Sequence, residues 1–308
     1  MSTNTLPTLP YDNWKETRTT FHLIMQIIGK VRLTLTPRKN HWWFITEYVT
    51  VNGFSTGNIP HPDGVNSFEL LYNVHKSQLE VSTSLGEERI IPLKDGLTIA
   101  QFYKQFKATM AELKIEVNIV DKPFDMGIDQ KFEEIENYHH YDKEYLKKFW
   151  QILVWLEGVF NEFSGRFYGK TCPVHLYWHH LDFTITRFSG RKAPALDPNM
   201  RLSDKDAYSH EVISFGFWAG DDIVTQPAFY SYTYPSPEGL DQEPLLPSYA
   251  KWVENNGSPM AMLFYHELIQ SDTPREDLLN FLESSYQAGA KLANWDVAGF
   301  TATPLEEM

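Results

Sequence analysis

Residues 67–93 read SFELLYNVHKSQLEVSTSLGEERIIPL and contain three strand-like stretches in close succession, Ser67–Asn73, Gln78–Thr83 and Arg89–Leu93. The gaps between them are only a few residues long. Runs of strands in this order, with helices before and after them, are typical of antiparallel sheets in α+β proteins and not of parallel βαβ units. This stretch therefore predicts an α+β fold.

A helix is predicted on each side of these strands. The first runs from Asp12, a possible N-cap, to about Ile28, because its apolar residues recur at steps of three and four. Gly29 is predicted to end it as a C′ glycine. The second runs over 98–114, where Thr98 and Gln101 can form a capping box.

Further strands are expected in the same half at Val31–Thr36 and Trp42–Val51, and a last one at Ile115–Val120. In the first of these, apolar and polar residues alternate, which is typical of a half-buried strand. Residues 1–11 are polar and predict an arm. Residues 121–143 are acidic and poorly periodic, and we expect them to form a segment that crosses between two halves.

The second half repeats the order of elements. A helix is expected from about Asp142 to Phe163, and a last helix opens with Thr273 as N-cap and Pro274 at its first position, with Glu276 as box partner, and runs to about Ala293. Between them lie five strand-like stretches: Val174–Trp178, Leu181–Arg187, Glu211–Trp218, Ala228–Tyr234 and Ala261–His266.

A local sequence similarity accompanies this repeated order of elements. Gly29-Lys30 follows the first helix and Gly169-Lys170 follows the helix of the second half, while TVNGFSTGNIP (50–60) and TITRFSGRKAP (184–194) share Thr, Phe-Ser and Pro in register. Internal repeats of this kind indicate duplication. We expect two similar halves, each helix–antiparallel strands–helix, packed as one globular unit, with boundaries at 1–11, 12–120, 121–143 and 144–308.

Composition limits the classes of partner. The net charge of −13 opposes binding to nucleic acid and to anionic membranes. Cys172 is the single cysteine, which suits a reducing compartment. The N-terminus has no signal-peptide pattern, and no apolar run approaches the length of a membrane span. A cytoplasmic location is expected, and the sequence leaves the cofactor and the oligomeric state undetermined.

Two motifs resemble catalytic signatures, but the elements predicted around them are not the ones that these signatures require. GFSTG (53–57) matches a nucleophile elbow around Ser55, but two prolines follow where a helix is required. GRFYGKT (165–171) is one residue short of a phosphate-binding loop, and a helix precedes it where one should follow.

A metal site and a carboxylate pair are weaker alternatives. His175 and His179 would share a face on a helix, but on a strand they lie roughly 13 Å apart. His139 and His140 could supply further ligands. Asp182, Glu211 and Glu267 are carboxylates near aromatic residues that could transfer protons, although their spacing does not place them together.

Local charge inversion is the strongest functional signal. Residues 29–43 carry +4 and residues 163–192 also carry +4, inside an acidic chain. Arginine guanidinium groups hold carboxylate or phosphate bidentately, and aromatic residues can stack on a ligand. If the halves face each other, the predicted ligand-binding residues are Lys30, Trp42, Trp43, Arg166, Lys170, Trp178, Arg187 and Arg191, with His41 and His175 as the catalytic candidates.

The strings GKVRL (29–33), NHWW (40–43), FSGRFYGK (163–170), RFSGRKAP (187–194) and FYSYTYP (229–235) are distinctive. With them the chain resembles an uncharacterised bacterial family, domain of unknown function 5996, from about Trp14 to Trp295. The resemblance implies a bacterial, cytosolic protein and no assigned activity. The family pattern has small residues at positions 179 and 180, which favours His175 among the three histidines.

These observations predict a protein that binds, and could act on, a small anionic metabolite in a basic, aromatic-lined cleft between the halves. One alternative is an interaction or scaffold module that uses exposed aromatic residues, such as the run Phe229–Tyr234. A further alternative is a metal-dependent enzyme that uses histidines.

Overall fold

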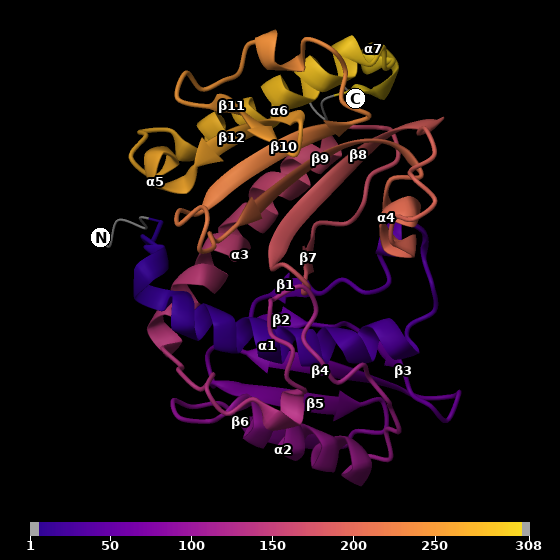
Figure 1. Ribbon diagram of the computed structural model, residues 1–308, viewed down its shortest axis with the longest axis vertical. Helices are drawn as coiled ribbons and strands as arrows, with labels where there is room; N and C mark the ends of the chain where they lie inside the picture. Colours follow the sequence, from indigo (N-terminus) through magenta and orange to yellow (C-terminus); the bar gives the residue numbers. More distant parts are fainter. Residues whose placement is uncertain (1–5, 304–308) are drawn as a thin grey trace.

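The computed structural model describes residues 6–303, which form seven α-helices and two antiparallel sheets. Figure 1 shows the two sheets one above the other, with α1 running between them. The fold is therefore α+β, as the sequence predicts. The hydrophobic core runs through both halves as a single cluster, so they pack as one unit. None of the helices in this range is long and apolar enough to cross a membrane.

The first sheet has the order β1-β2-β4-β5-β6, with β3 paired to β4. Helix α1 packs on it through Phe21, whose ring lies 5.0 Å from Phe54 and 5.1 Å from Tyr72. The elements of this half are α1 (Tyr11–Leu35), η1 (Asn40–Trp42), β1 (Tyr48–Thr50), β2 (Gly53–Ser55), β3 (Ile59–Pro60), β4 (Ser67–Asn73), β5 (Gln78–Thr83), β6 (Glu88–Pro92) and α2 (Ile99–Glu112).

The second sheet has the order β11-β12-β10-β9-β8-β7. Its elements follow the irregular segment with η2 (Phe132–Glu134), and they are α3 (Lys143–Gly165), β7 (His175–Tyr177), β8 (Asp182–Lys192), α4 (Leu202–Ala207), β9 (His210–Trp218), β10 (Ala228–Tyr234), η3 (Leu240–Gln242), β11 (Lys251–Asn255), β12 (Ser258–Phe264), α5 (Tyr265–Leu268), α6 (Pro274–Leu292) and α7 (Val297–Phe300).

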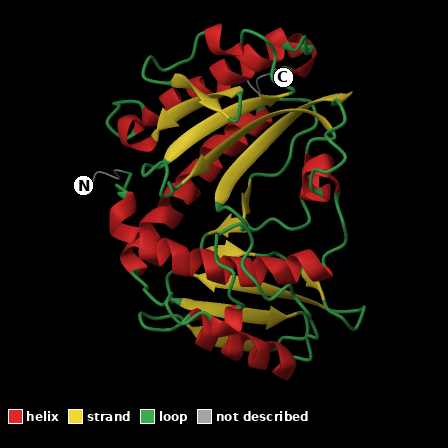
Figure 2. Ribbon diagram, in the orientation of Figure 1, coloured by secondary structure: helices red, strands yellow, loops and turns green. Residues whose placement is uncertain are grey.

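The two faces of the second sheet differ. Figure 2 shows α3 and α6 together on one side of it. Alternation along the strands turns apolar residues such as Phe215 and Phe229 toward these helices, where both are fully buried. The residues in between, such as Tyr230 and Tyr232, face the other way. No helix of the second half covers that face in Figure 2, and it borders the cavity described below.

Several helix ends are confirmed in detail. Thr98 and Gln101 form the predicted capping box of α2. Asp142 caps α3 by accepting hydrogen bonds from the backbone of Glu144 and Tyr145. The start of α6 is also as predicted, with Pro274 in its first turn, although the Thr273 side chain makes no capping hydrogen bond.

The end of α1 was wrongly predicted. The helix does not stop at Gly29 but continues to Leu35, so the expected strand Val31–Thr36 is helical, and Pro10 rather than Asp12 occupies the N-cap position. The reason lies in tertiary packing. A Cβ on Gly29 would stand 2.2 Å from the indole ring of Trp178, so this glycine allows close approach of a bulky side chain and does not terminate the helix.

Other predicted elements also differ. Of Trp42–Val51 only Tyr48–Thr50 is a strand, and Ile115–Val120 is irregular. The two similar sequence segments do not have equivalent structures. Residues 50–60 contain the end of β1, the whole of β2 and β3 and the loops between them, whereas residues 184–192 lie within one strand, β8. Residues 1–5 of the predicted arm lie outside the described residues. Residues 6–10 are not a free arm, since Leu9 is buried and Tyr265 donates a hydrogen bond to the Pro7 carbonyl.

Candidate functional site

The predicted site residues divide into three groups that do not share one cleft. At one point the two basic segments do meet: Lys170 Nζ lies 2.8 Å from His41 Nε2 and 5.2 Å from the Trp43 ring. His41 Nδ1 donates to the Ala207 carbonyl oxygen, which leaves Nε2 as the acceptor for Lys170. Burial, and then Lys170, lower the pKa of His41. This imidazole is therefore held neutral.

The three arginines of the second basic segment are engaged elsewhere. Arg187 is 1% exposed, lies 3.6 Å from the centre of the Phe163 ring and donates to the Phe163 carbonyl oxygen. Arg191 pairs with Glu211 at 2.7 Å and donates to carbonyls at the end of α6. Arg166 pairs with a neighbour on its own helix. The expected convergence of these arginines with Lys30 on one cleft is not found.

The remaining predicted residues lie in the interior between the halves. Lys30 Nζ stands 5.8 Å from the Phe132 ring and 6.0 Å from the Trp178 ring, and burial lowers its pKa to about 8. His175 is buried, and neither ring nitrogen has a hydrogen-bond partner among residues 6–303. Burial lowers the pKa of His175 to about 3. Trp42 packs against Phe44, with ring centres 5.2 Å apart.

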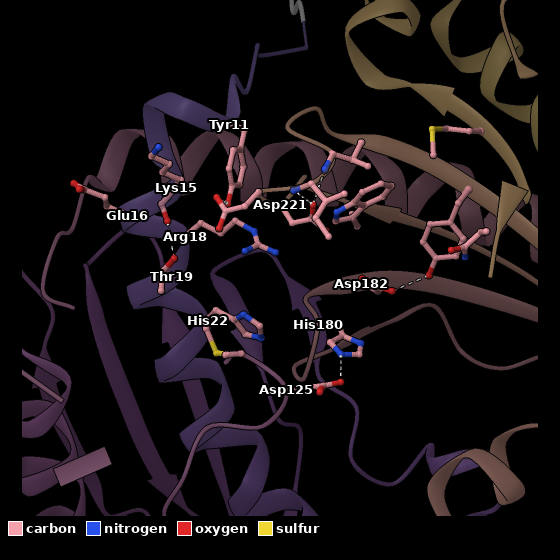
Figure 3. A pocket seen from close by; sticks show the side chains of 18 of the residues that line it. Tyr11, Lys15, Glu16, Arg18, Thr19, His22, Asp125, His180, Asp182 and Asp221 are labelled. Atoms are coloured by element: carbon pink, nitrogen blue, oxygen red, sulfur yellow. Dashed lines mark hydrogen bonds and ion pairs between the residues drawn. The ribbon is translucent and has the colours of Figure 1, made fainter. Parts of the chain in front are cut away.

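A large cavity lies where the halves join, and none of the ten predicted ligand-binding and catalytic residues lines it. We call it the junction groove: a space of about 1310 Å³ between the first turns of α1, residues 125–140 and the uncovered face of the second sheet (Figure 3). Its polar and aromatic lining includes Tyr11, Lys15, Glu16, Arg18, His22, Asp125, Tyr138, His180, Asp182, Tyr208, Trp218, Asp221, Asp222, Tyr230, Tyr232, Lys251, Glu254 and Phe264.

Arg18 enters the groove from α1. Figure 3 shows its side chain extending from the helix toward the second sheet. The Arg18 side chain is half-buried. Its Nε atom is inaccessible to water and has no hydrogen-bond partner, and the side chain forms no ion pair with any residue among 6–303. Burial lowers the pKa of this guanidinium, against the raising effects of Tyr11, Asp221 and Asp182. Arg18 is a half-buried cation that no anion contacts in the described part of the chain.

Asp182 stands on β8, on the other wall. Tyr230 on β10 donates a hydrogen bond to its Oδ2 at 3.0 Å. The tyrosine reaches across β9 because its partner there is Gly216: a Cβ at that position would lie 2.4 Å from the Tyr230 ring. Burial raises the pKa of Asp182, while His180, this hydrogen bond and Arg18 lower it.

Other contacts fix the wall and the rim. Tyr208 and Tyr232 share a hydrogen bond of 3.0 Å between their hydroxyl oxygens. At the rim, His180 contacts Asp125 at 3.3 Å (Figure 3), and Tyr11 donates to Asp222 at 3.0 Å. The groove is therefore lined with hydrogen-bonded tyrosines and fixed charges.

The groove differs from the expected cleft in its charge. Six carboxylate side chains and three basic side chains line it, so it is acidic where a basic cleft was predicted. The acidic residues are Glu16, Asp125, Asp182, Asp221, Asp222 and Glu254, and the basic ones are Lys15, Arg18 and Lys251.

Two alternatives receive no support from the positions of their residues. The aromatic run Phe229–Tyr234 is buried or half-buried along β10 and forms no exposed patch. Among residues 6–303 no group of three or more His, Cys, Asp or Glu side chains is placed to hold a metal ion. Ser55 lies in β2 and is followed by β3, so no nucleophile elbow forms there.

Sequence reasoning missed Arg18 and the tyrosines of β10, and it named Asp182 only as one of several carboxylates. Two features of the sequence could have indicated these residues. Arg18 stands four residues after Trp14 and four before His22, both buried, so a charge interrupts the buried stripe of a helix. In β10 a tyrosine occupies every second position, which places all three on one face.

A comparison with protein families matches residues 6–302 to the model of a family described as a family of unknown function, DUF5996. The match spans nearly the whole chain. No curated protein and no solved structure is detectably similar to it.

Proposed function

Because the chain belongs to the DUF5996 family, whose function is unknown, we propose its function from the junction groove: it binds a small anionic metabolite, and Arg18 holds the anion. The proposal keeps the class of ligand that the sequence predicts. Arg18 takes the place of the predicted anion-binding residues, which are Lys30, Arg166, Lys170, Arg187 and Arg191. His41 and His175 do not line the groove, so the proposal gives them no part in ligand binding.

The state of Arg18 is the observation that carries the proposal. A buried charge costs several kcal/mol of desolvation unless an opposite charge and hydrogen bonds offset it. Within residues 6–303, no carboxylate contacts the Arg18 guanidinium and its buried Nε has no hydrogen-bond partner, so Asp182, Asp221 and Asp222 act on it only from a distance. Its guanidinium presents several N–H donors in a planar fork that matches a carboxylate or phosphate. A ligand anion would supply the missing partner.

The walls of the groove, rather than its volume, support a small-molecule ligand. Its volume of about 1310 Å³ is somewhat above the range of about 300–1000 Å³ usual for small-molecule pockets. Tyr230 and Tyr232 offer rings and hydroxyls that hydrogen bonds already orient. Such a site can bind a metabolite without large rearrangement of its walls.

Thermal unfolding in the presence of small molecules that carry a carboxylate or phosphate group tests the proposal. The probes are glutarate, δ-aminovalerate and inorganic phosphate, each at rising concentration. A bound ligand stabilises the folded state by about 2.7 kcal/mol at a concentration of 100 Kd. We expect at least one probe to raise the melting temperature of the wild type and none to raise that of Arg18→Met.

Arg89→Met is the matched control, because Arg89 pairs with Glu112 on the surface of the first half, away from the groove. It should respond to the probes as the wild type does. An equal shift in Arg18→Met, or no shift with any probe in the wild type, would contradict the proposal.

A further inference from the structure

Two charged side chains face the junction groove from opposite walls, and neither touches an opposite charge. Arg18 on α1 forms no ion pair within residues 6–303, and Asp182 on β8 forms none either. The single hydrogen-bond partner of Asp182 in that range is Tyr230, on Oδ2. The two charges act on each other electrostatically but do not come within contact distance.

From this placement we infer that the ligand is an amino acid: a molecule whose carboxylate binds Arg18 and whose ammonium group binds Asp182. The inference rests on one part of the proposed function, that Arg18 holds the anionic group of the ligand, and it replaces a simple anion with a zwitterion. Such a molecule bridges the two walls and gives each buried charge the contact it lacks.

The charge of the groove favours a zwitterion over a simple anion. Carboxylates outnumber basic side chains there by six to three. A dicarboxylate would add two negative charges to this acidic lining and leave Asp182 without a cation. A molecule with one carboxylate and one ammonium group adds no net charge, and its two ends match the two walls.

The aromatic residues beside Asp182 favour a cation at that end. The rings of Tyr230 and Tyr232 are stacked with their centres 6.2 Å apart, on the same face of β10 as the contact to Asp182. An ammonium group held by the carboxylate would lie beside these rings, and the faces of aromatic rings attract cations. Tyr230 therefore contributes both through its hydroxyl, which orients Asp182, and through its ring.

Binding measured by calorimetry with three matched series tests the inference. The probes are the ω-amino acids from β-alanine to ε-aminocaproate, the dicarboxylates from malonate to adipate, and the diamines of the same chain lengths. We expect one length of ω-amino acid to bind the wild type at least about tenfold more tightly than the dicarboxylate and the diamine of that length.

Two variants test separately how the ammonium end and the carboxylate end of the ligand are bound. Asp182→Asn should remove the preference for the ω-amino acid over the dicarboxylate, and Arg18→Met should weaken binding of both. Tyr230→Phe, which keeps the ring and removes the hydroxyl, should weaken ω-amino acid binding by a smaller factor. It provides a second readout if Asp182→Asn does not fold. Asp129→Asn is the matched control, since Asp129 is an exposed residue that pairs with Lys122 and does not itself line the groove.

The possible outcomes test the inference separately from the proposed function on which it rests. Dicarboxylates that bind as tightly as ω-amino acids, with Arg18 required and Asp182→Asn without effect, would overturn the inference and leave the proposed function standing. Diamines that bind best and do not need Arg18, or no binding by any probe, would overturn both.

Discussion

Two arginines on the same helix show two different uses of a buried charge. Arg32, near the end of α1, is 5% exposed and lies in what we call the interior cluster, with Glu47 and His175. It donates to the Thr56 carbonyl oxygen and packs 5.5 Å from the Tyr48 ring. Arg18, four turns earlier, is half-buried, makes no hydrogen bond within residues 6–303 and faces the junction groove.

The surroundings explain the difference. Glu47 and Leu176 exchange backbone hydrogen bonds of 2.9 and 2.7 Å, which join the two halves directly beside the interior cluster. All three members of that cluster are closed off from solvent, so no ligand can reach them. The groove, in contrast, is open to molecules from solution. We conclude that Arg32 stabilises the first half, where its contacts with Thr56 and Tyr48 lie, whereas we propose that Arg18 contributes to ligand binding and little to folding.

The largest loss is expected for Arg32→Met. The substitution removes the donor to the buried Thr56 carbonyl oxygen and the guanidinium that packs on the Tyr48 ring. Leaving a buried acceptor without its partner costs about 1–3 kcal/mol, and the lost packing adds to that cost. We predict a loss of about 3 kcal/mol in the free energy of unfolding, measured with urea. A loss below about 1 kcal/mol would show that the contacts of Arg32 do not stabilise the fold.

Gly29→Ala tests the close packing at the same junction. Alanine favours a helix interior by about 1 kcal/mol over glycine. Here its Cβ would stand 2.2 Å from the Trp178 ring, which is itself buried. Overpacking of this kind costs about 1–3 kcal/mol, so we predict a net loss. In the background of Trp178→Leu, Gly29→Ala should become neutral or stabilising. If Gly29→Ala stabilises the wild type, the contact is not as close as described.

Glu47→Gln tests the charge state of the interior cluster. Burial raises the pKa of Glu47 well above 4.5, its ordinary value. The folded state then holds a proton that the unfolded state releases, so the contribution of Glu47 to stability is complete below pH 4.5 and declines as pH rises. The slope is at most about 1.4 kcal/mol per pH unit.

The comparison is made above pH 6.5, the ordinary pKa of histidine, because buried His175 is neutral there in both states. Urea unfolding at several pH values should show the stability of the wild type falling more steeply than that of Glu47→Gln. Parallel curves for the two proteins would mean that Glu47 is ionised in the folded state.

The sequence predicted local structure well where local signals decide it. The bounds of Ser67–Asn73, Gln78–Thr83 and Ala228–Tyr234 match strands β4, β5 and β10, and the Thr98 capping box is present. The prediction failed at Gly29, because a glycine that admits Trp178 and a glycine that ends a helix look alike in sequence. Only the contact with a residue far along the chain distinguishes them.

The site was less accessible to sequence analysis. The basic segments drew attention because charge stands out in an acidic chain, yet Arg187 packs against aromatic rings and Arg191 pairs with Glu211. Arg18, Asp182 and Tyr230 come from three distant elements, α1, β8 and β10. Their placement around one groove depends on how α1 lies over the second sheet, and the spacing of residues in the sequence does not encode that arrangement.

The smallest stability change is expected for Arg18→Met, and it tests the central claim most directly. The variant keeps most of the apolar stem and removes a buried charge that has no contacting partner in residues 6–303. We predict that its free energy of unfolding in urea, without ligand, stays within about 0.5 kcal/mol of the wild type or rises. A loss as large as that of Arg32→Met would contradict the account, because Arg18 would then serve the fold and not a ligand.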